Sequence, residues 1–331
     1  MQNQQVCAQD ISSQPLVSFV VTTYDLPSGL LRECLGSILD LSLSASEREI
    51  ILVDDGSAEP AINGLSDLKD CFVYLRQRNQ GPSVARNHAL GIARGRYIQF
   101  VDGDDYLFPH VYEHCLDLVR FEEPDVVHFE MTSAEGKSAH PTTKHEGPME
   151  GYRYMLSRNI HGSACSYVFR TSILGSLRFT PGIMHEDEEF TPLLLLRART
   201  VVSVDDTAYF YRQREGSRSN SEGGEKHVEK SLSDNEGVLF RLQSMALSIP
   251  ELERTALDRR IAQLTMDYLY RVAGLTGNID RLNEAIERLE ERALYPLPAK
   301  KYTAKYVLFR KLVATAPGRR ALVGMAKRLK G

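Results

Sequence analysis

Acidic side chains gather in three short segments, each at or just beyond the end of an apolar, β-rich run. The segments hold Asp25 after residues 17–21, Asp54 and Asp55 after residues 50–53, and Asp102, Asp104 and Asp105 after residues 97–101. In a parallel sheet, ligands bind at the carboxyl ends of the strands, so these carboxylates are expected at one edge. Hard divalent cations take oxygen ligands, usually one or two carboxylates plus substrate phosphates. The pattern therefore predicts a metal ion that holds a diphosphate substrate.

The spacing of Asp102 and Asp104 allows both carboxylates to face one ion across Gly103, a residue that permits close backbone approach. Each segment has a simpler interpretation when taken alone. The sequence Asp54-Asp55-Gly56-Ser57 is also typical of a polar turn after a strand, and an isolated Asp-x-Asp is common by chance. The joint order of the segments is the more specific signal.

The first two hundred residues alternate between β-rich runs and segments with helical spacing. Strands are predicted at residues 17–21, 50–53, 72–75, 97–101 and 125–131, and helices at residues 28–41, 81–93 and 186–199. This alternation is typical of an α/β fold in which a mostly parallel, Rossmann-like sheet is flanked by helices.

The character of the chain changes after residue 214. Residues 215–226 are polar and rich in Gly and Ser, which favours a loop, and helical patterns follow at residues 227–247, 251–273 and 279–292. We therefore expect an N-terminal tail (1–14), an α/β domain (15–215), a C-terminal helical extension (216–298) and a basic amphipathic tail (299–331).

That tail contains ten Lys and Arg residues and no Asp or Glu, although the net charge of the whole chain is −4. A basic amphipathic helix can lie among the headgroups of an anionic membrane. The alternative is a helix that docks on the acidic body of the protein and keeps its basic face in water. Because the body is acidic, nucleic acid is not an expected partner.

Composition excludes several classes of protein. Hydrophobic residues make up 42% and charged residues 25% of the chain, as in ordinary globular proteins. No apolar stretch approaches the roughly 18–20 residues of a membrane span, and residues 1–14 lack a secretory signal pattern. Five scattered cysteines without a CxxC pair favour free thiols over a zinc site. We expect a cytoplasmic protein, held peripherally on the inner face of the cell membrane if the tail binds lipid.

Four segments in order resemble the nucleotide-sugar domain of the family 2 glycosyltransferases, inverting enzymes of the GT-A fold. They are Val17–Asp25 (VSFVVTTYD), Val53–Ser57 (VDDGS), Gln80–Asn87 (QGPSVARN) and Phe100–Asp105 (FVDGDD). A fifth segment, His185–Phe190 (HEDEEF), is similar to the ED block of the family. The resemblance covers about residues 15–215 and implies that they form a nucleotide-sugar-binding catalytic domain.

The resemblance also implies roles for individual residues. Thr22, Tyr24 and Asp54 would border the base and ribose of the nucleotide. Arg86 and Asn87 would approach the diphosphate. Asp104 would ligate Mn²⁺ or Mg²⁺, and Asp102 would meet the ribose or the metal's water shell. Arg212 would lie on a lid that closes over the diphosphate and excludes water; a solvated arginine on a surface strand is the alternative.

Asp187 would be the general base that deprotonates the acceptor hydroxyl. Glu186 and Glu188 are rivals for this role, and the simplest alternative is that residues 186–189 only place negative charge at a helix N-terminus. A single displacement at the sugar inverts the anomeric centre and needs no enzyme nucleophile.

The resemblance implies transfer of a sugar from a nucleotide-diphosphate donor, most simply a UDP-sugar, to a hydroxyl of a glycan or lipid-linked glycan in cell-surface polysaccharide synthesis. One rival is a sugar nucleotidyltransferase, although residues 22–27 lack the Gly-rich, basic loop that such enzymes carry after the first strand. The other is a non-catalytic protein that binds nucleotides or glycans on the same fold.

Overall fold

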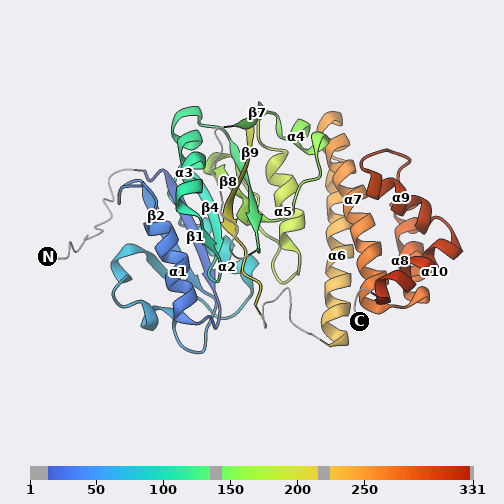
Figure 1. The fold of residues 1–331 in the computed structure, drawn as a ribbon, viewed down its shortest axis with the longest axis horizontal. Helices are drawn as coiled ribbons and strands as arrows, with labels where there is room; N and C mark the ends of the chain where they lie inside the picture. The colour runs from blue at the N-terminus through green and yellow to red at the C-terminus, as the bar shows by residue number, and fades with distance from the viewer. Residues whose placement is uncertain (1–13, 135–143, 215–223, 329–331) are drawn as a thin grey trace. The chain divides into compact units, whose positions relative to one another are not determined.

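The computed structural model describes residues 14–134, 144–214 and 224–328. It forms two compact units (Figure 1), an α/β unit from the described parts of residues 1–151 and 161–221, and a helical unit from residues 152–160 and the described residues after 221. Nearly all of the predicted N-terminal tail and most of the predicted loop at residues 215–226 lie outside the described residues.

Nine strands of the described residues form one sheet, in the order β3-β2-β1-β4-β8-β6-β9-β5, with β7 paired to β9. Their bounds are β1 Val17–Thr23, β2 Arg48–Asp54, β3 Val73–Arg76, β4 Tyr97–Asp102, β5 Tyr106–Leu107, β6 Val126–Thr132, β7 His145–Met149, β8 Tyr167–Arg170 and β9 Val201–Phe210. The predicted α/β class is confirmed.

The sheet is mixed, and its parallel part is smaller than the sequence predicted. Strands β3, β2, β1 and β4 are parallel neighbours, as are β6 and β9. Strand β8 lies antiparallel between β4 and β6, and β5 and β7 run antiparallel to β9. Apolar composition shows that a strand is buried but not its direction, which depends on the path of the preceding connection.

Helices cover both faces of the sheet. The α/β unit carries α1 Ser28–Leu39, α2 Pro82–Leu90, α3 Pro109–Asp117 and α5 Glu186–Leu195, and α4 Gly151–Ser157 begins at its boundary. Consecutive strand residues face opposite sides. Accordingly, Gln99 of β4 accepts a hydrogen bond from Tyr112 of α3 (3.0 Å), whereas the Phe100 ring packs against Phe190 of α5, with 6.1 Å between centroids.

The register of the parallel strands aligns their acidic ends. Thr23 of β1 pairs with Asp54 of β2, and Thr22 pairs with Asp102 of β4. The segments that follow β1, β2 and β4 therefore leave the sheet at one edge, as the sequence predicted. This alignment is what positions the candidate site.

The helical unit contains α6 Glu225–Ala246, α7 Glu251–Thr276, α8 Ile279–Glu291, α9 Ala304–Val313 and α10 Ala316–Arg328, drawn from yellow-orange to red in Figure 1. Helix α8 has a buried stripe at Leu282, Ala285, Ile286 and Leu289. The Asn278 side chain caps its start by accepting hydrogen bonds from the amides of Asp280 (2.8 Å) and Arg281 (3.4 Å).

The predicted basic tail folds into α9 and α10, which pack on α7, and α10 also contacts α8. Its buried apolar side chains are Tyr306, Phe309, Val313, Leu322 and Val323. Leu308 and Met325 remain exposed. Much of the apolar surface that a membrane helix would insert is thus used for packing inside the helical unit. Among the described residues, no helix is long and apolar enough to cross a membrane.

The close approach of residue 95 to β1 gives a stability prediction. A Cβ on Gly95 would lie 2.4 Å from the Ser18 amide nitrogen and 2.8 Å from the Tyr97 carbonyl oxygen, so Gly95→Ala must displace backbone. We expect Gly95→Ala to lower the free energy of unfolding by about 1–3 kcal/mol in urea titration.

Gly36→Ala is the matched control, since a Cβ at Gly36 in α1 would meet nothing within 4 Å. It should leave stability unchanged or raise it by up to about 1 kcal/mol, because alanine favours the helix. Equal stability of the two variants would contradict this account of Gly95.

Candidate active site

Asp54 ends β2 and orders the loop that follows it. Its buried carboxylate accepts hydrogen bonds from the amides of Ser57 (2.8 Å) and Ala61 (3.0 Å) and from the Tyr74 hydroxyl (2.7 Å). Burial acts to raise the pKa of Asp54, but the hydrogen bonds from Ala61 and Ser57 outweigh it and lower that pKa below its usual value. The carboxylate predicted to meet the base is thus engaged by its own loop.

Asp55, which the sequence placed among the strand-end carboxylates that could hold a cation, organises a second loop. Its oxygens accept hydrogen bonds from the Gln77 side-chain amide (2.8 Å) and from the backbone amides of Gln80 (2.9 Å) and Gly81 (2.8 Å). Gly81 has a positive φ of 87° and directly precedes α2. Asp55 therefore fixes the start of the helix that carries Arg86 and Asn87.

Thr22 and Tyr24 lie at the end of β1. The Thr22 hydroxyl is 3.5 Å from Asp102 Oδ1, and the Tyr24 side chain is 49% exposed. The next residue, Asp25, ties this segment to the loop after β2, because its amide donates to Ser57 Oγ (2.9 Å) and its carboxylate accepts from the Ala58 amide (2.7 Å). The Tyr24 ring is therefore held at the edge but open to solvent.

Arg86 is the centre of the site. Its buried guanidinium pairs with Asp102 at 2.9 Å, Glu186 at 2.9 Å and Asp187 at 3.1 Å, and so joins β4 to the first turn of α5. The carbon of the guanidinium also lies 5.3 Å from the centroid of the Phe179 ring. Burial acts to lower the pKa of Arg86, but the charges of Asp187, Asp102 and Glu186 outweigh it and hold the pKa well above its usual value. The cation is permanent, and it offsets the repulsion among the three carboxylates.

Asn87 binds the backbone of Phe179. Its side-chain nitrogen donates to the Phe179 carbonyl (2.8 Å) and its side-chain oxygen accepts from the Phe179 amide (2.9 Å). These two bonds hold the segment whose aromatic ring packs against Arg86. Asn87 thus acts through Phe179 in this structure, and its predicted contact with a diphosphate stays a prediction.

Asp187 combines partial exposure with a raised pKa. Besides Arg86, its carboxylate accepts a hydrogen bond from the Ala164 amide at 3.2 Å. Burial is the largest influence and raises the pKa of Asp187 to about 7; Arg86 opposes this, and the charges of Glu186 and Asp102 add to it. A carboxylate with a pKa near neutrality is well matched to accept a proton. Its rival Glu186 is bound by the same guanidinium, so the two acids share one countercharge.

The turn after β4 is held from β9. The Tyr209 hydroxyl donates to Asp105 Oδ2 (2.7 Å) and accepts from the Asp102 amide (3.1 Å). Burial, helped by the charge of Asp102, raises the pKa of Asp105 to about 8. The buried Asp105 is thus a structural anchor, which leaves Asp102 and Asp104 as the carboxylates that can face a ligand.

Two arginines beyond the end of β9 contact this turn. Arg212 donates from its backbone amide to Asp105 Oδ1 (2.8 Å), and its side chain reaches the Asp104 carbonyl (2.9 Å) and Glu33 (2.6 Å). Arg214 pairs with Asp104 Oδ2 at 2.6 Å. Arg212 is therefore hydrogen-bonded to the turn after β4 and is not a solvated surface residue.

Sequence reasoning did not find the contacts of Tyr209 and Arg214 with the turn after β4, or the loop contacts of Asp55. Tyr209 and Arg214 are more than a hundred positions from the aspartates that they contact, and no local pattern reports such a pairing. The adjacency of Asp55 to Asp54 was a usable signal, because an aspartate in a turn often accepts hydrogen bonds from nearby backbone amides.

Three cysteines of the described residues, Cys34, Cys115 and Cys165, are buried thiols that form no disulfide. The described residues also contain no group of three or more His, Cys, Asp or Glu side chains placed to hold a metal ion. Any metal at this site would thus take its ligands from Asp102, Asp104 and a bound substrate.

Comparisons with known proteins agree with this geometry. Residues 18–176 match the sequence model of glycosyl transferase family 2. EpsH of Bacillus subtilis (strain 168) is 28% identical over 215 residues, which cover 60% of this chain and 61% of EpsH. TarS of Staphylococcus aureus, a poly(ribitol-phosphate) beta-N-acetylglucosaminyltransferase, is 26% identical over 212 residues, 62% of this chain and 37% of TarS. The chain thus spans less than two thirds of the length of these curated relatives.

Solved structures extend the likeness over the helical unit. The crystal structure of S. aureus TarS 1–349 in complex with UDP-GlcNAc aligns with a TM-score of 0.68 at 19% identity, over 95% of this chain and 92% of that one. The mannosyltransferase PcManGT from Pyrobaculum calidifontis, in complex with GDP-Man and Mn²⁺, aligns with a TM-score of 0.57 at 14% identity, over 98% and 88%. At these identities the likeness is one of fold, and it confirms the predicted GT-A fold with a C-terminal helical extension.

The shared countercharge gives a pH-dependent stability prediction. Arg86→Met keeps much of the side-chain volume but leaves three carboxylates unpaired, which should cost about 3–5 kcal/mol of unfolding free energy. Without Arg86, the pKa of Asp187 moves further above 7, so the native state keeps a proton that the unfolded chain releases. Stability then falls more steeply with rising pH, and the deficit should be about 1 kcal/mol larger at pH 8 than at pH 6.

Arg32→Met is the control for this experiment, with urea unfolding as the measurement at both pH values. Arg32 forms an exposed pair with Asp67, whose pKa is lowered to about 2 by the Arg32 hydrogen bond. That carboxylate does not titrate between pH 6 and 8, so the deficit should be small and constant. A constant deficit for Arg86→Met as well would mean that Arg86 does not govern the ionisation of Asp187.

Proposed function

We propose that this chain, whose residues 18–176 match the model of glycosyl transferase family 2, is a member of that family and transfers a sugar from a nucleotide-diphosphate donor to a hydroxyl acceptor with inversion at the anomeric carbon. The observation that carries the proposal is the cluster around Arg86. It holds Asp187, a carboxylate with a pKa near 7, beside the Asp102 end of the Asp102–Asp104 turn. The Arg86 guanidinium thus contacts both the proposed proton acceptor, Asp187, and Asp102, which belongs to the proposed site for the leaving group.

Asp187 is the proposed general base. An attacking hydroxyl must lose its proton as it bonds to the sugar carbon, and an ionised carboxylate within hydrogen-bond reach accepts it. The hydrogen bonds from Arg86 and the Ala164 amide fix the direction of this carboxylate. Direct displacement needs no enzyme nucleophile, and the pKa of the nearby Cys165 thiol is raised by burial, which keeps that thiol protonated.

Asp104 and Asp102 are the proposed ligands of Mg²⁺ or Mn²⁺. Both side chains are partly exposed, and both are oxygen donors of the kind that these ions prefer when phosphates complete the coordination. A bound divalent ion would stabilise the charge on the diphosphate leaving group. Asp104 and Asp102 can bind the metal ion on one condition, which is that the ion pair between Arg214 and Asp104 opens. Arg214 and Arg212 are then placed to contact the diphosphate and exclude water.

The donor is proposed to be a UDP-sugar, with the half-exposed Tyr24 ring at β1 available to stack on the base. TarS, which shares the fold, is solved with UDP-GlcNAc, and this supports the choice of nucleotide. The acceptor is proposed to be a glycan or lipid-linked glycan of a cell-surface polysaccharide. Basic residues of α9 and α10, with the exposed Leu308, would add weak contact with an anionic membrane surface.

Substitution of Asp187 distinguishes a transferase from a protein that only binds nucleotides. Asp187→Asn keeps the shape of the side chain but removes the proton acceptor, so sugar transfer should fall by about 10²–10⁴-fold while calorimetry still detects UDP binding.

In the unmodified protein, kcat/KM should rise with pH through an apparent pKa of about 7, because Asp187 must be ionised to accept the proton. An Asp187→Asn variant with full transfer activity would assign the base elsewhere.

The Arg214 contact predicts competition between an arginine and a metal for one carboxylate. Arg214→Ala should bind Mn²⁺ alone about fivefold more tightly, because the Asp104 carboxylate no longer has a resident cation. The same variant should bind UDP with Mn²⁺ more weakly, since one diphosphate contact is lost. Free Mn²⁺ is measured by electron paramagnetic resonance, and UDP by calorimetry. Arg32→Ala, which removes an exposed guanidinium far from Asp104 in the sequence, should leave both affinities unchanged; unaltered Mn²⁺ affinity in Arg214→Ala would refute the competition.

A further inference from the structure

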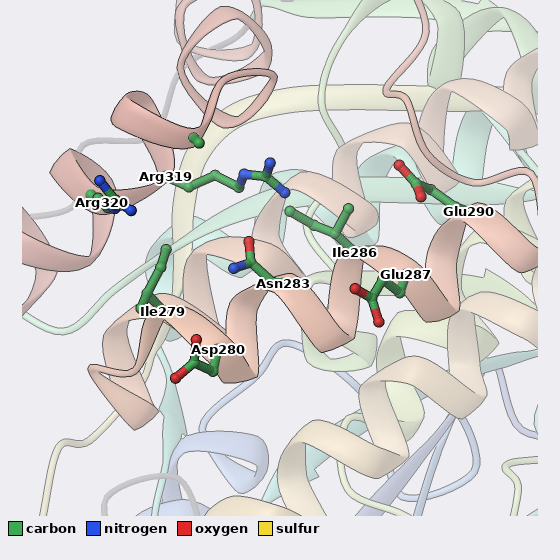
Figure 2. A pocket seen from close by; sticks show the side chains of 9 residues that line it. Ile279, Asp280, Asn283, Ile286, Glu287, Glu290, Arg319 and Arg320 are labelled. Atoms are coloured by element: carbon green, nitrogen blue, oxygen red, sulfur yellow. The ribbon is translucent and has the colours of Figure 1, made fainter.

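A polar pocket lies wholly inside the helical unit, between α8 and the start of α10. Its cavity volume is about 400 Å³, within the usual range of small-molecule sites. Six lining residues carry charged or amide side chains and three are apolar; the lining is Asp280, Asn283, Glu287, Glu290, Arg319, Arg320, Ile279, Ile286 and Ala316. Figure 2 shows the Arg319 side chain reaching from α10 across the space above α8.

The polar side chains of this pocket do not form hydrogen bonds or ion pairs with other side chains of the described residues, although carboxylates on α8 and two guanidiniums on α10 line the same pocket. Asn283 Oδ1 and Arg319 Nε are shielded from solvent and lack a partner. Buried polar atoms without partners cost free energy, so a ligand that satisfies them would gain affinity.

The rest of α8 shows that this is a local exception. Away from the pocket, Arg288 of the same helix pairs with Glu236 at 2.7 Å, and Arg281 pairs with Glu229. Arg319 and Arg320 are also poorly placed for the stability of α10, because positive charge near a helix N-terminus opposes the helix dipole.

The chemistry of the lining selects the ligand class. An anion would face the carboxylates of Asp280, Glu287 and Glu290, and a cation would face two guanidiniums. A neutral molecule dense in hydroxyl groups uses both kinds of partner, because each hydroxyl donates to a carboxylate or amide oxygen and accepts from a guanidinium. Ile279, Ile286 and Ala316 supply apolar contacts for the C–H faces of a sugar ring.

We propose that the pocket between α8 and α10 binds a neutral saccharide. The role rests on the proposed function, in which a transferase that extends a glycan gains affinity and specificity from a second subsite for its acceptor. Because the helical unit holds the whole pocket, saccharide binding there is separable from donor binding at Asp102 and Asp104.

The test measures saccharide and UDP binding on the same full-length variants. Glucose, N-acetylglucosamine and maltose are titrated by saturation-transfer difference NMR, and UDP with Mn²⁺ by calorimetry. Asn283→Ala should weaken binding of at least one saccharide about tenfold, because it removes a shielded hydrogen-bonding partner, and Glu287→Gln should weaken it about threefold to tenfold, because it removes a charged acceptor from the pocket rim. Glu284→Gln is the matched control, since Glu284 is exposed on α8 and does not line the pocket. UDP affinity should stay the same in all three variants.

Each outcome decides the pocket and the proposed function separately. The saccharide proposal is overturned if Glu287→Gln and Asn283→Ala bind saccharides with unchanged affinity. It is also overturned if the unmodified chain binds no saccharide, even when UDP binds. Binding of phosphocholine in place of saccharides overturns it as well, because a zwitterion is a different ligand class. Saccharide binding that is lost only in the pocket variants supports the proposal, and it does so even if UDP fails to bind and the transferase function is rejected. Glu287→Gln alters an exposed, unpaired side chain, so it stays informative if Asn283→Ala does not fold.

Discussion

The buried guanidinium of Arg86 is the interaction on which the site depends. Carboxylates from β4 and from the first turn of α5 would repel one another at this separation, and a permanent cation between them makes their approach favourable. The same contact determines the ionisation of Asp187. Burial and the neighbouring acids raise the pKa of that carboxylate, Arg86 limits the rise, and the result is a group poised near neutrality. One ion cluster therefore both holds β4 against α5 and sets the pKa of Asp187.

Around this centre, aspartates act mainly on the backbone. Asp54 and Asp55 accept hydrogen bonds from loop amides, and Asp105 receives bonds from Tyr209 and from the Arg212 amide. Loops at the carboxyl edge of a sheet expose many unpaired N–H groups, and buried carboxylates satisfy them. The acids that the sequence gathers at one edge therefore divide into those that build the loops and those, Asp102, Asp104 and Asp187, that keep an exposed face for a ligand.

The helical unit shows a comparable division for basic residues. Apolar side chains of α9 and α10 pack against the other helices, so the tail is part of a folded unit. Amphipathicity in the sequence reports that one face is buried but not what buries it, and protein and lipid satisfy it equally well. Arg319 and Arg320 of α10 line a pocket beside α8.

The sequence by itself determined the α/β class, the order of the elements and the edge at which the acids meet, because these follow from local periodicity and from the rule that parallel strands end together. It also predicted a helix that begins at Glu186 and carries Asp187 in its first turn. Only the tertiary structure decided that β8 runs antiparallel, that Asn87 binds the Phe179 backbone, and that Tyr209 and Arg214 hold the turn after β4. Those contacts join residues far apart in the chain, and their geometry depends on how the whole sheet brings distant segments together.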